Sequence, residues 1–338
     1  MISQDLIQLL SDSQWHSGQA VAEQFNVSRA AIWKQIETLR NYGLTIEADR
    51  GKGYRMVDTI QLCDVQKIQS LLSDTFTIAV LKELSIDSTN TRALQLVQTA
   101  EQTLPFVLFA DHQTAGRGRR GRKWLSPLGR SLYFSLAWQF DRSLAELSGL
   151  SLVVAIAIKE TLEQQGITGV ELKWPNDLLA DAKKLAGVLI ELQGEASGPC
   201  AVVIGVGVNL SLSELREPPD DEITQPWIDL IQLSASSDKK GGQVTNRAAL
   251  LDRNQLSADF INAIVTALSE FEEKGFSAFV ERWRNADFLS NKSVEIEYGG
   301  QVIEGEYLGV LKDGSIQINS GDDVQNIFGG EISVRAVH

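Results

Sequence analysis

A short, strongly basic, glycine-spaced segment is the first place in this sequence where residue types and spacing indicate chemistry. Between Arg117 and Lys123 five of seven residues are cations, and glycines separate them. No Asp or Glu occurs from residue 113 to residue 140, although the whole chain has a formal net charge of -13. A local positive excess on an acidic protein attracts anions, so the segment predicts an anion-binding loop.

Several kinds of ligand fit a loop of this composition. The glycine spacing matches the dinucleotide fingerprint, but that fingerprint requires a helix to begin there, and Pro127 and Gly129 follow instead. A nucleotide-covering loop between strands, as in protein kinases, lacks its usual companion motifs here. A patch that meets nucleic acid or solvent is the third interpretation. Apolar alternation at 106–110 and 132–138 predicts strands that hold the loop rigidly, which favours a small-ligand site.

Composition limits the class of protein. The 338 residues suffice for two or three domains, and 43% apolar with 22% charged residues is typical of a soluble protein. With a pI near 4.8 the protein as a whole is negatively charged and repels the phosphates of nucleic acid. Any DNA contact must therefore come from a local basic face. Cys63 and Cys200 lack metal-site spacing and the histidines are scattered, so we expect no protein-bound metal. With no signal segment and no apolar run of bilayer length, we expect a cytoplasmic protein without membrane contacts.

The first 60 residues have the pattern of a winged helix-turn-helix unit. Amphipathic helices are expected near residues 6–10, 17–25 and 28–42, followed by two short strands joined by a wing turn at 49–52. Six Lys or Arg stand against three acids from residue 29 to residue 55, where a third helix and a wing would meet a duplex. A helical bundle for protein contacts is the alternative. The candidate DNA contacts are Ser28, Arg29, Lys34, Arg50 and Lys52.

Polar or small residues stand where the expected central strands end. Residues 88–90, Ser-Thr-Asn, fit a helix cap after a strand and also offer hydroxyls to a ligand. A turn at 175–177 ends another strand, and glycines near residue 205 let a backbone approach a ligand closely. The expected elements are strands at 78–84, 169–174, 183–192 and 201–210 and a buried helix at 144–165.

Four ordered motifs resemble those of the biotin-protein ligases. They are Gly-Arg-Gly-Arg-Arg-Gly-Arg at 116–122, Lys-Trp-Pro-Asn-Asp at 173–177, Lys-Leu-Ala-Gly at 184–187 and Gly-Val-Gly-Val-Asn at 205–209. With the winged helix in front, the chain is similar to the bifunctional subclass that is also the biotin operon repressor. The resemblance implies an α+β multidomain fold. Its expected domains are a winged helix-turn-helix DNA-binding domain at 1–63, a mixed-sheet ligase domain like class II synthetases at 64–290, and an SH3-like C-terminal β-barrel at 291–338.

The resemblance also implies a reaction and a set of site residues. Biotin and ATP with Mg²⁺ give biotinyl-5'-AMP, and the biotinyl group then passes to a lysine of an acceptor protein. One anion attacks another in the first step, so guanidinium and ammonium groups are needed to neutralise charge. The catalytic candidates are Arg117, Arg119 and Lys184, and Asp177 is a candidate to hold Mg²⁺ or orient the acceptor lysine. The substrate-binding candidates are Ser88, Thr89, Asn90, Gln113, Gly116, Arg117, Gly118, Arg119, Arg120, Trp124, Lys184, Gly205 and Gly207. The nucleotide-binding candidates are Arg119, Arg122, Lys173, Asn176, Asn209, Trp227 and Arg335.

The later chain continues the likeness with one departure. Trp227 matches the family's adenine-covering tryptophan, at the end of a mobile loop expected over 212–226. The polar segment 234–243 is an insertion that the family pattern lacks, and its composition predicts a disordered surface loop. A helix is expected near 256–271, and short alternating strands from residue 292 onward predict a small barrel.

The resemblance implies three partners. They are the biotin carboxyl carrier protein of acetyl-CoA carboxylase, operator DNA, and a second copy of the chain when biotinyl-AMP, the corepressor, is bound. A lipoate-protein ligase shares the fold and chemistry, but its arginine-rich glycine pattern differs. A ligand-sensing regulator without catalysis is the alternative from another class, and the presence of both Arg119 and Lys184 disfavours it.

Overall fold

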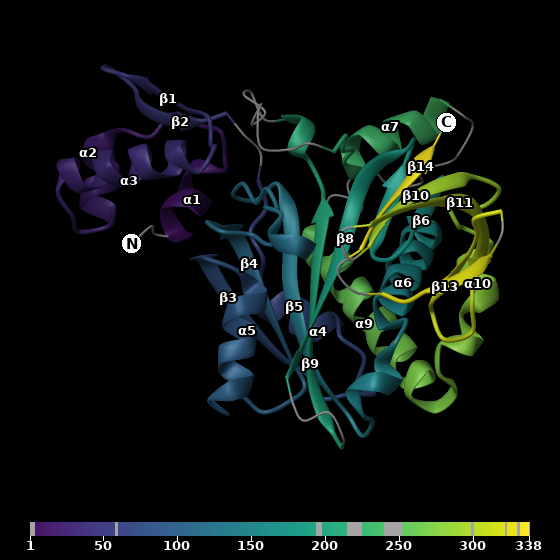
Figure 1. The fold of residues 1–338 in the computed structure, drawn as a ribbon. Helices are drawn as coiled ribbons and strands as arrows, with labels where there is room; N and C mark the ends of the chain where they lie inside the picture. Colours follow the sequence, from purple (N-terminus) through teal and green to yellow (C-terminus); the bar gives the residue numbers. More distant parts are fainter. Residues whose placement is uncertain are drawn as a thin grey trace.

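The structure is a computed structural model that describes residues 4–57, 60–193, 198–214, 225–239, 252–298, 301–321, 323–329 and 332–337. Figure 1 shows the N-terminal elements at one side of a central sheet and the C-terminal strands at the other. The α+β multidomain fold expected from the sequence is confirmed. We propose 1–63, 64–290 and 291–338 as the domain limits.

The N-terminal group is a winged helix-turn-helix unit. Its elements are α1 (Gln4–Leu10), α2 (Gly18–Gln24), α3 (Arg29–Asn41), β1 (Ile46–Asp49) and β2 (Gly53–Met56). The hydroxyl of Ser28 caps α3, because it accepts a hydrogen bond from the Ala31 amide at 3.1 Å. Ile32, Ile36 and Leu39 are buried on the inner face of α3, and the antiparallel pair β1 and β2 forms the wing.

The central sheet brings the predicted motifs to one end of the molecule. Its strands are β3 (Ala79–Ile86), β4 (Phe106–Gln113), β5 (Ser131–Phe140), β6 (Val170–Lys173), β7 (Asp177–Ala180), β8 (Lys183–Gln193) and β9 (Cys200–Asn209), in the order β3-β4-β5-β9-β8-β7-β6. Only β3 and β4 are parallel. In the antiparallel register Ser131 pairs with Asn209, Val208 with Ala186, and Gly187 with Asp177. The start of β5, the end of β9 and the starts of β8 and β7 therefore meet.

Both faces of this sheet are covered. The surrounding helices are α4 (Val65–Leu71), α5 (Thr89–Gln98), α6 (Leu150–Gln164) and α9 (Arg253–Lys274). Side chains of β4 alternate between two cores: Val107 and Phe109 join the one formed with α6 and α9, while Phe106 and Leu108 join the one formed with α5. Because helices and core side chains pack on both faces, the sheet is a rigid platform for the loops at its end.

Three sequence predictions need correction. Asp177 begins the short strand β7, which the sequence did not predict, instead of ending a turn. The helix expected from residue 144 is broken into a 3₁₀ turn, η2 (Leu144–Leu147), and α6, because Gly149 has a φ of 83° against the Phe276 ring. Residues 234–239 belong to helix α7 (Leu230–Lys239) and are not a disordered loop, whereas 240–243 lie outside the described residues.

The C-terminal group forms an antiparallel sheet, consistent with the predicted small barrel. Its strands, after η4 (Phe276–Ala278) and α10 (Val280–Arg284), are β10 (Ser293–Tyr298), β11 (Gln301–Val310), β12 (Ile316–Asn319), β13 (Val324–Ile327) and β14 (Ser333–Val337), in the order β13-β12-β11-β10-β14. The buried Trp174 indole donates to the Gly314 carbonyl at 3.0 Å and ties this sheet to the end of β6. Across the described ranges, none of the helices has the length and apolar character to span a bilayer.

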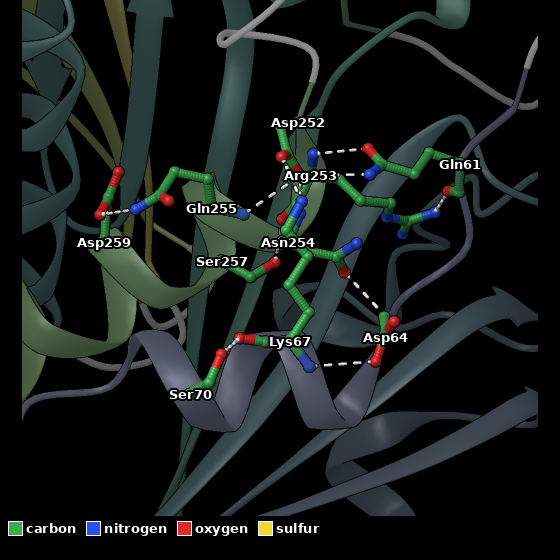
Figure 2. A network of polar contacts seen from close by, with 10 residues as sticks. All are labelled: Gln61, Asp64, Lys67, Ser70, Asp252, Arg253, Asn254, Gln255, Ser257 and Asp259. Carbon is green, nitrogen blue, oxygen red and sulfur yellow. Dashed lines mark hydrogen bonds and ion pairs between the residues drawn. The ribbon is translucent and has the colours of Figure 1, made fainter.

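The linker to the N-terminal unit is held by a polar network that we call the linker joint. It consists of the exposed Gln61 and the largely buried side chains of Lys82, Asp111 and Arg253. Figure 2 shows Gln61 facing the first residues of α9. The Arg253 guanidinium donates to the carbonyls of Gln61 at 2.6 Å and Ser131 at 2.9 Å, and lies 3.3 Å from Asp111 Oδ1. Lys82 Nζ is 2.8 Å from the other Asp111 oxygen. The joint thus fastens the linker to β3, β4, β5 and α9 at once.

A second contact connects the N-terminal unit with the end of β4. The Tyr42 ring, directly after α3, stacks on the His112 ring with centroids 4.0 Å apart. Leu128 is fully buried in the core of the N-terminal unit, although it belongs to the segment between β4 and β5. The return arm of the basic segment is therefore a packing surface for the N-terminal unit.

Candidate active site

The basic segment 114–130, called the arginine loop below, is a well-formed excursion between β4 and β5. At its tip, the Gly118 amide donates to the Arg122 carbonyl at 2.7 Å, and the Trp124 amide to the Gly116 carbonyl at 2.8 Å. A side chain at Gly116 would come within 2.5 Å of the Trp124 carbonyl, and Arg120 turns the chain with a φ of 58°. The guanidiniums consequently project from a defined backbone.

Gln113 fixes the base of this loop. Its side-chain carbonyl accepts from the Thr89 amide at 2.8 Å, and its amide donates to the Ser126 hydroxyl at 2.9 Å. Ser88 and Thr89 begin α5, so one side chain joins β4, the α5 N-terminus and the returning arm. Ser88 occupies the N-cap position without making a side-chain cap hydrogen bond.

The arginine loop covers a cavity of about 890 Å³ at the end of the central sheet. Lining predicted positions are Ser88, Thr89, Asn90, Gln113, Arg117, Gly118, Arg119, Arg120, Arg122, Trp124, Lys173, Asn176, Lys184, Gly205, Gly207, Asn209, Trp227 and Arg335, whereas Gly116 does not line it. The lining also includes Lys123, Tyr133 and Ile332, which were not predicted as site residues. Lys123 belongs to the same basic run as the arginines, so it could have been predicted from the sequence. The predicted site residues, scattered over 248 positions of sequence from Ser88 to Arg335, share one cavity.

The charge of the cavity wall is strongly unbalanced. Eight Lys or Arg side chains line it, against the single carboxylate of Asp177 among the described residues. Burial lowers the pKa of both Arg119 and Lys173. The neighbouring cations Lys184, Arg122 and Arg335 lower the pKa of Lys173 further. The Asp177 carboxylate acts in the opposite direction on both groups. Partly desolvated cations at such a site interact strongly with an anion, because the local dielectric is low.

Lys184 lines the cavity between Asp177 and Trp124. Its Nζ lies 2.7 Å from Asp177 Oδ1 and 5.3 Å from the centroid of the Trp124 ring. A Cβ at Gly207 would lie 2.6 Å from the same indole. Gly207 therefore makes room for Trp124, where the sequence suggested close approach of a ligand, and Trp124 both lines the cavity and packs beneath the loop.

Arg119 and Asn176 connect the loop to the far side of the cavity. Arg119 Nη1 donates to the Asn176 side-chain carbonyl at 3.1 Å, and the Asn176 amide donates to the Val188 carbonyl at 2.8 Å. At the rim, Arg120 pairs with Glu297 of β10 at 3.0 Å. Arg335 lines the cavity from β14, so the C-terminal sheet completes one wall.

Trp227 is brought beside Lys184 by backbone pairing. The Lys184 amide donates to the Pro226 carbonyl at 2.8 Å, and the Ile228 amide donates to the Lys184 carbonyl at 3.0 Å. The Asn209 side-chain amide donates to the carbonyls of Lys184 and Ile228, each at 3.2 Å. Asn209 thus orders the wall around Trp227. Most of the loop predicted to be mobile, residues 215–224, lies outside the described residues.

Two predicted ligand contacts are engaged elsewhere. Arg117, predicted to frame a carboxylate, donates from Nη2 to both carboxylate oxygens of Glu191, at 2.8 and 3.0 Å. Asn90 donates its amide to Glu191 at 2.8 Å, and Gly205 leaves room for Asn90, because a Cβ there would lie 2.2 Å from Asn90 Oδ1. Glu191 was not predicted from the sequence, although a carboxylate inside the apolar strand 185–192 was a signal.

The candidate DNA contacts form a separate face on the N-terminal unit. Arg40 and Arg55 are paired with Glu37 and Glu47, each at 2.6 Å, and so are neutralised. All five candidates, at the start of α3 and on the wing, are exposed: Ser28, Arg29, Lys34, Arg50 and Lys52. Trp33, 57% exposed on α3 beside Lys34, was missed by the sequence analysis, although an aromatic residue on a solvent-facing helix position was a usable signal.

Comparisons with known proteins agree with this geometry. Residues 83–209 match the Biotin/lipoate A/B protein ligase family, and residues 3–55 match an HTH domain. A bifunctional ligase/repressor BirA from Salmonella typhimurium is 38% identical over 331 residues, covering 98% of this chain and 97% of the relative. The chain belongs to the bifunctional ligase/repressor family. A second family member, from Bacillus spizizenii, is 28% identical and covers 98% of both chains.

A solved structure extends the family likeness to three dimensions. The biotin protein ligase from Aquifex aeolicus in complex with biotin and ATP is 29% identical, with a TM-score of 0.60, and covers 77% of this chain and 99% of that chain. The family's ligase architecture is thus present in this chain, with a DNA-binding unit in addition.

Proposed function

We propose that this chain is an ATP-dependent biotin-protein ligase that is also a DNA-binding repressor. The observation that carries the ligase assignment is the ratio of eight cations to one carboxylate around the described cavity of a protein with a net charge of -13. Joining a carboxylate to a triphosphate brings two anions together, and such a wall offsets their repulsion. The family membership identifies the acid as biotin.

The reaction has two steps. A carboxylate oxygen of biotin attacks the α-phosphorus of ATP, an O–P bond forms, and pyrophosphate leaves. An acceptor lysine of a biotin carboxyl carrier protein, in its neutral form, then attacks the acyl carbon, and AMP leaves. We assign charge neutralisation to Arg119 and Lys184, with Arg117 supporting the loop. Because Asp177 is already paired with Lys184, Mg²⁺ would enter mainly as the partner of the ATP phosphates.

The remaining positions divide by their place in the cavity. Ser88, Thr89 and Gln113 lie at the base of the arginine loop, and together with the loop glycines they suit the biotin end. Trp227 can stack on the adenine, because it stands beside Lys184 at the cavity wall. The nucleotide side is proposed to comprise Arg122, Lys173, Asn176, Asn209, Trp227 and Arg335.

ATP–pyrophosphate exchange tests this assignment. We expect exchange that depends on biotin and is at least tenfold weaker with lipoate at the same concentration. Exchange that prefers lipoate would reassign the chain to the lipoate ligases. The absence of exchange with either acid would identify a ligand-sensing regulator without catalysis.

We further propose that biotinyl-AMP drives two copies of the chain to pair and bind a palindromic operator. β8 continues past its pairing with β7: residues 188–193 have β9 on one side and no described strand on the other. An exposed strand edge is a template for pairing with a second copy. Pairing would place two α3 helices on one duplex, with Arg29, Lys34 and the wing cations on phosphates and Trp33 against base edges.

Gel shifts test the repressor assignment. Operator affinity should rise when biotin and ATP are added together and should not rise with either alone. Equal operator binding with and without the two substrates would contradict the coupling between pocket and DNA.

A further inference from the structure

Glu191 connects the arginine loop with the edge of the central sheet at β8. Its carboxylate receives Arg117 Nη2 at 2.8 and 3.0 Å and the Asn90 amide at 2.8 Å. Arg117 and Asn90 both line the cavity, whereas Glu191 does not. Glu191 therefore acts on any ligand only through its two partners.

Asn90 makes this connection rigid. It is 3% exposed, and its side-chain carbonyl accepts the Ser135 hydroxyl at 2.6 Å. Its amide also reaches the Leu189 carbonyl at 3.2 Å. Because β5 and β8 both hold Asn90, the Glu191 carboxylate has little freedom, and Arg117 is fastened to a fixed point.

The position of Glu191 on β8 adds the second connection. It lies in the 188–193 segment that extends beyond β7 and forms the sheet edge proposed for pairing. One carboxylate thus contacts the arginine loop on one side and belongs to that edge on the other. Movement of the loop must either carry this edge with it or break the Arg117 to Glu191 pair.

We propose that Glu191 is a positioning residue that fastens the arginine loop to the β8 edge through Arg117, so that closure of the loop over the adenylate is linked to pairing of the edge. The inference rests on the proposed function. Since Arg117 is 43% and Glu191 25% exposed by side chain, the pair is screened by solvent. A contribution of about 1 kcal/mol, equal to roughly a fivefold change in a rate or equilibrium, is expected from such a pair.

The test compares the wild type with Glu191→Gln. This change removes the negative charge that faces Arg117 but keeps the side-chain shape and a hydrogen-bond acceptor for Asn90. Biotinyl-AMP release should become about fivefold faster and the KM for biotin should rise, while kcat of ATP–pyrophosphate exchange stays within about twofold. Glu163→Gln, which removes an exposed carboxylate paired with Lys159, is the matched control and should change neither. Adenylate release at the wild-type rate in Glu191→Gln overturns the proposal.

A double-mutant cycle distinguishes fastening from general loosening. Arg117→Gln should speed release by a similar factor, and the double variant should be no faster than either single variant; additive effects would overturn the fastening role. By sedimentation equilibrium, Glu191→Gln should lose part of the adenylate-dependent gain in self-association, and an unchanged gain overturns the link to the edge. If the wild type forms no adenylate, the proposed function fails instead.

Discussion

The linker joint and the cavity both collect cations, but they treat charge in opposite ways. In the joint, Asp111 at 0% and Arg253 at 1% side-chain exposure are paired, and the backbone carbonyls of Gln61 and Ser131 accept from the two terminal guanidinium nitrogens. In the cavity, eight cations face one carboxylate among the described lining residues. In the joint, both cations share one buried carboxylate, so each has a carboxylate partner within the protein. A binding site keeps an excess that its ligand completes.

Loss of Asp111 is the strongest way to test the structural half of this comparison. Asp111→Ala leaves Lys82 and Arg253 buried without their counter-ion, so the free energy of unfolding should fall by about 3–5 kcal/mol. Urea denaturation measures the loss. Glu163→Ala, which breaks an exposed pair, should cost less than about 0.5 kcal/mol. Equal small losses in both variants would show that the joint is not structural.

Loss of Lys184 tests the cavity half. Lys184→Ala should reduce biotin-dependent ATP–pyrophosphate exchange by about 10²–10³-fold, the usual effect of removing one group that stabilises developing charge. The free energy of unfolding should change little, since Lys184 is only partly buried. The neighbouring exposed Lys183, outside the cavity lining, supplies the control: Lys183→Ala should keep normal exchange.

Arg119 should matter more for keeping the intermediate than for making it. Arg119→Ala should speed biotinyl-AMP release by about 10–100-fold, because a charge-assisted contact from the loop is lost. Released adenylate should then label lysines of bystander proteins, which blotting for biotin detects. Arg50→Ala on the wing should release adenylate normally, and bystander labelling no greater than that of the wild type would contradict this role for Arg119.

The smallest expected effect is a pH dependence of the free energy of unfolding that comes from His112, which follows Asp111 of the linker joint in sequence. Burial lowers the pKa of His112 to about 4, below its ordinary 6.5, so the folded state favours the neutral ring. Below pH 6.5 the unfolded state takes up the proton first, and stability present above pH 6.5 is lost as the pH falls toward 4. Wild type should lose about 1–2 kcal/mol between pH 7 and pH 5 relative to His112→Phe, as measured by urea denaturation. Parallel pH profiles for the two proteins would contradict this.

Much of the fold could be predicted because local signals agreed with it. The Ser28 cap, the inner stripe of α3 and the alternation of β4 each depend on neighbouring residues. β7 was missed because a four-residue strand directly after Asn176 has no period of its own. The break before α6 lies at Gly149, and the Ser143 to Glu146 capping box and this glycine were local signals for it. The packing of Gly149 against Phe276, more than 120 residues away in sequence, has no local signal.

The site shows the same division. The cations of the arginine loop and Lys184 were found from composition and motif, since their chemistry is visible in the residue types. Asp177, the partner of Lys184, was also named from its motif. Glu191, the partner of Arg117, was not, because it acquires this role only when β8 is set beside the arginine loop and α5. The antiparallel register that brings the motifs to one end of the sheet is likewise a property of the whole topology.

A crystal structure of the chain soaked with biotin, ATP and Mg²⁺ would show whether the arginine loop holds the intermediate. We expect biotinyl-AMP in the cavity of about 890 Å³, with its acyl-phosphate oxygens within hydrogen-bond distance of Arg119 and Lys184. Density for the adenylate outside the reach of the arginine loop would contradict it.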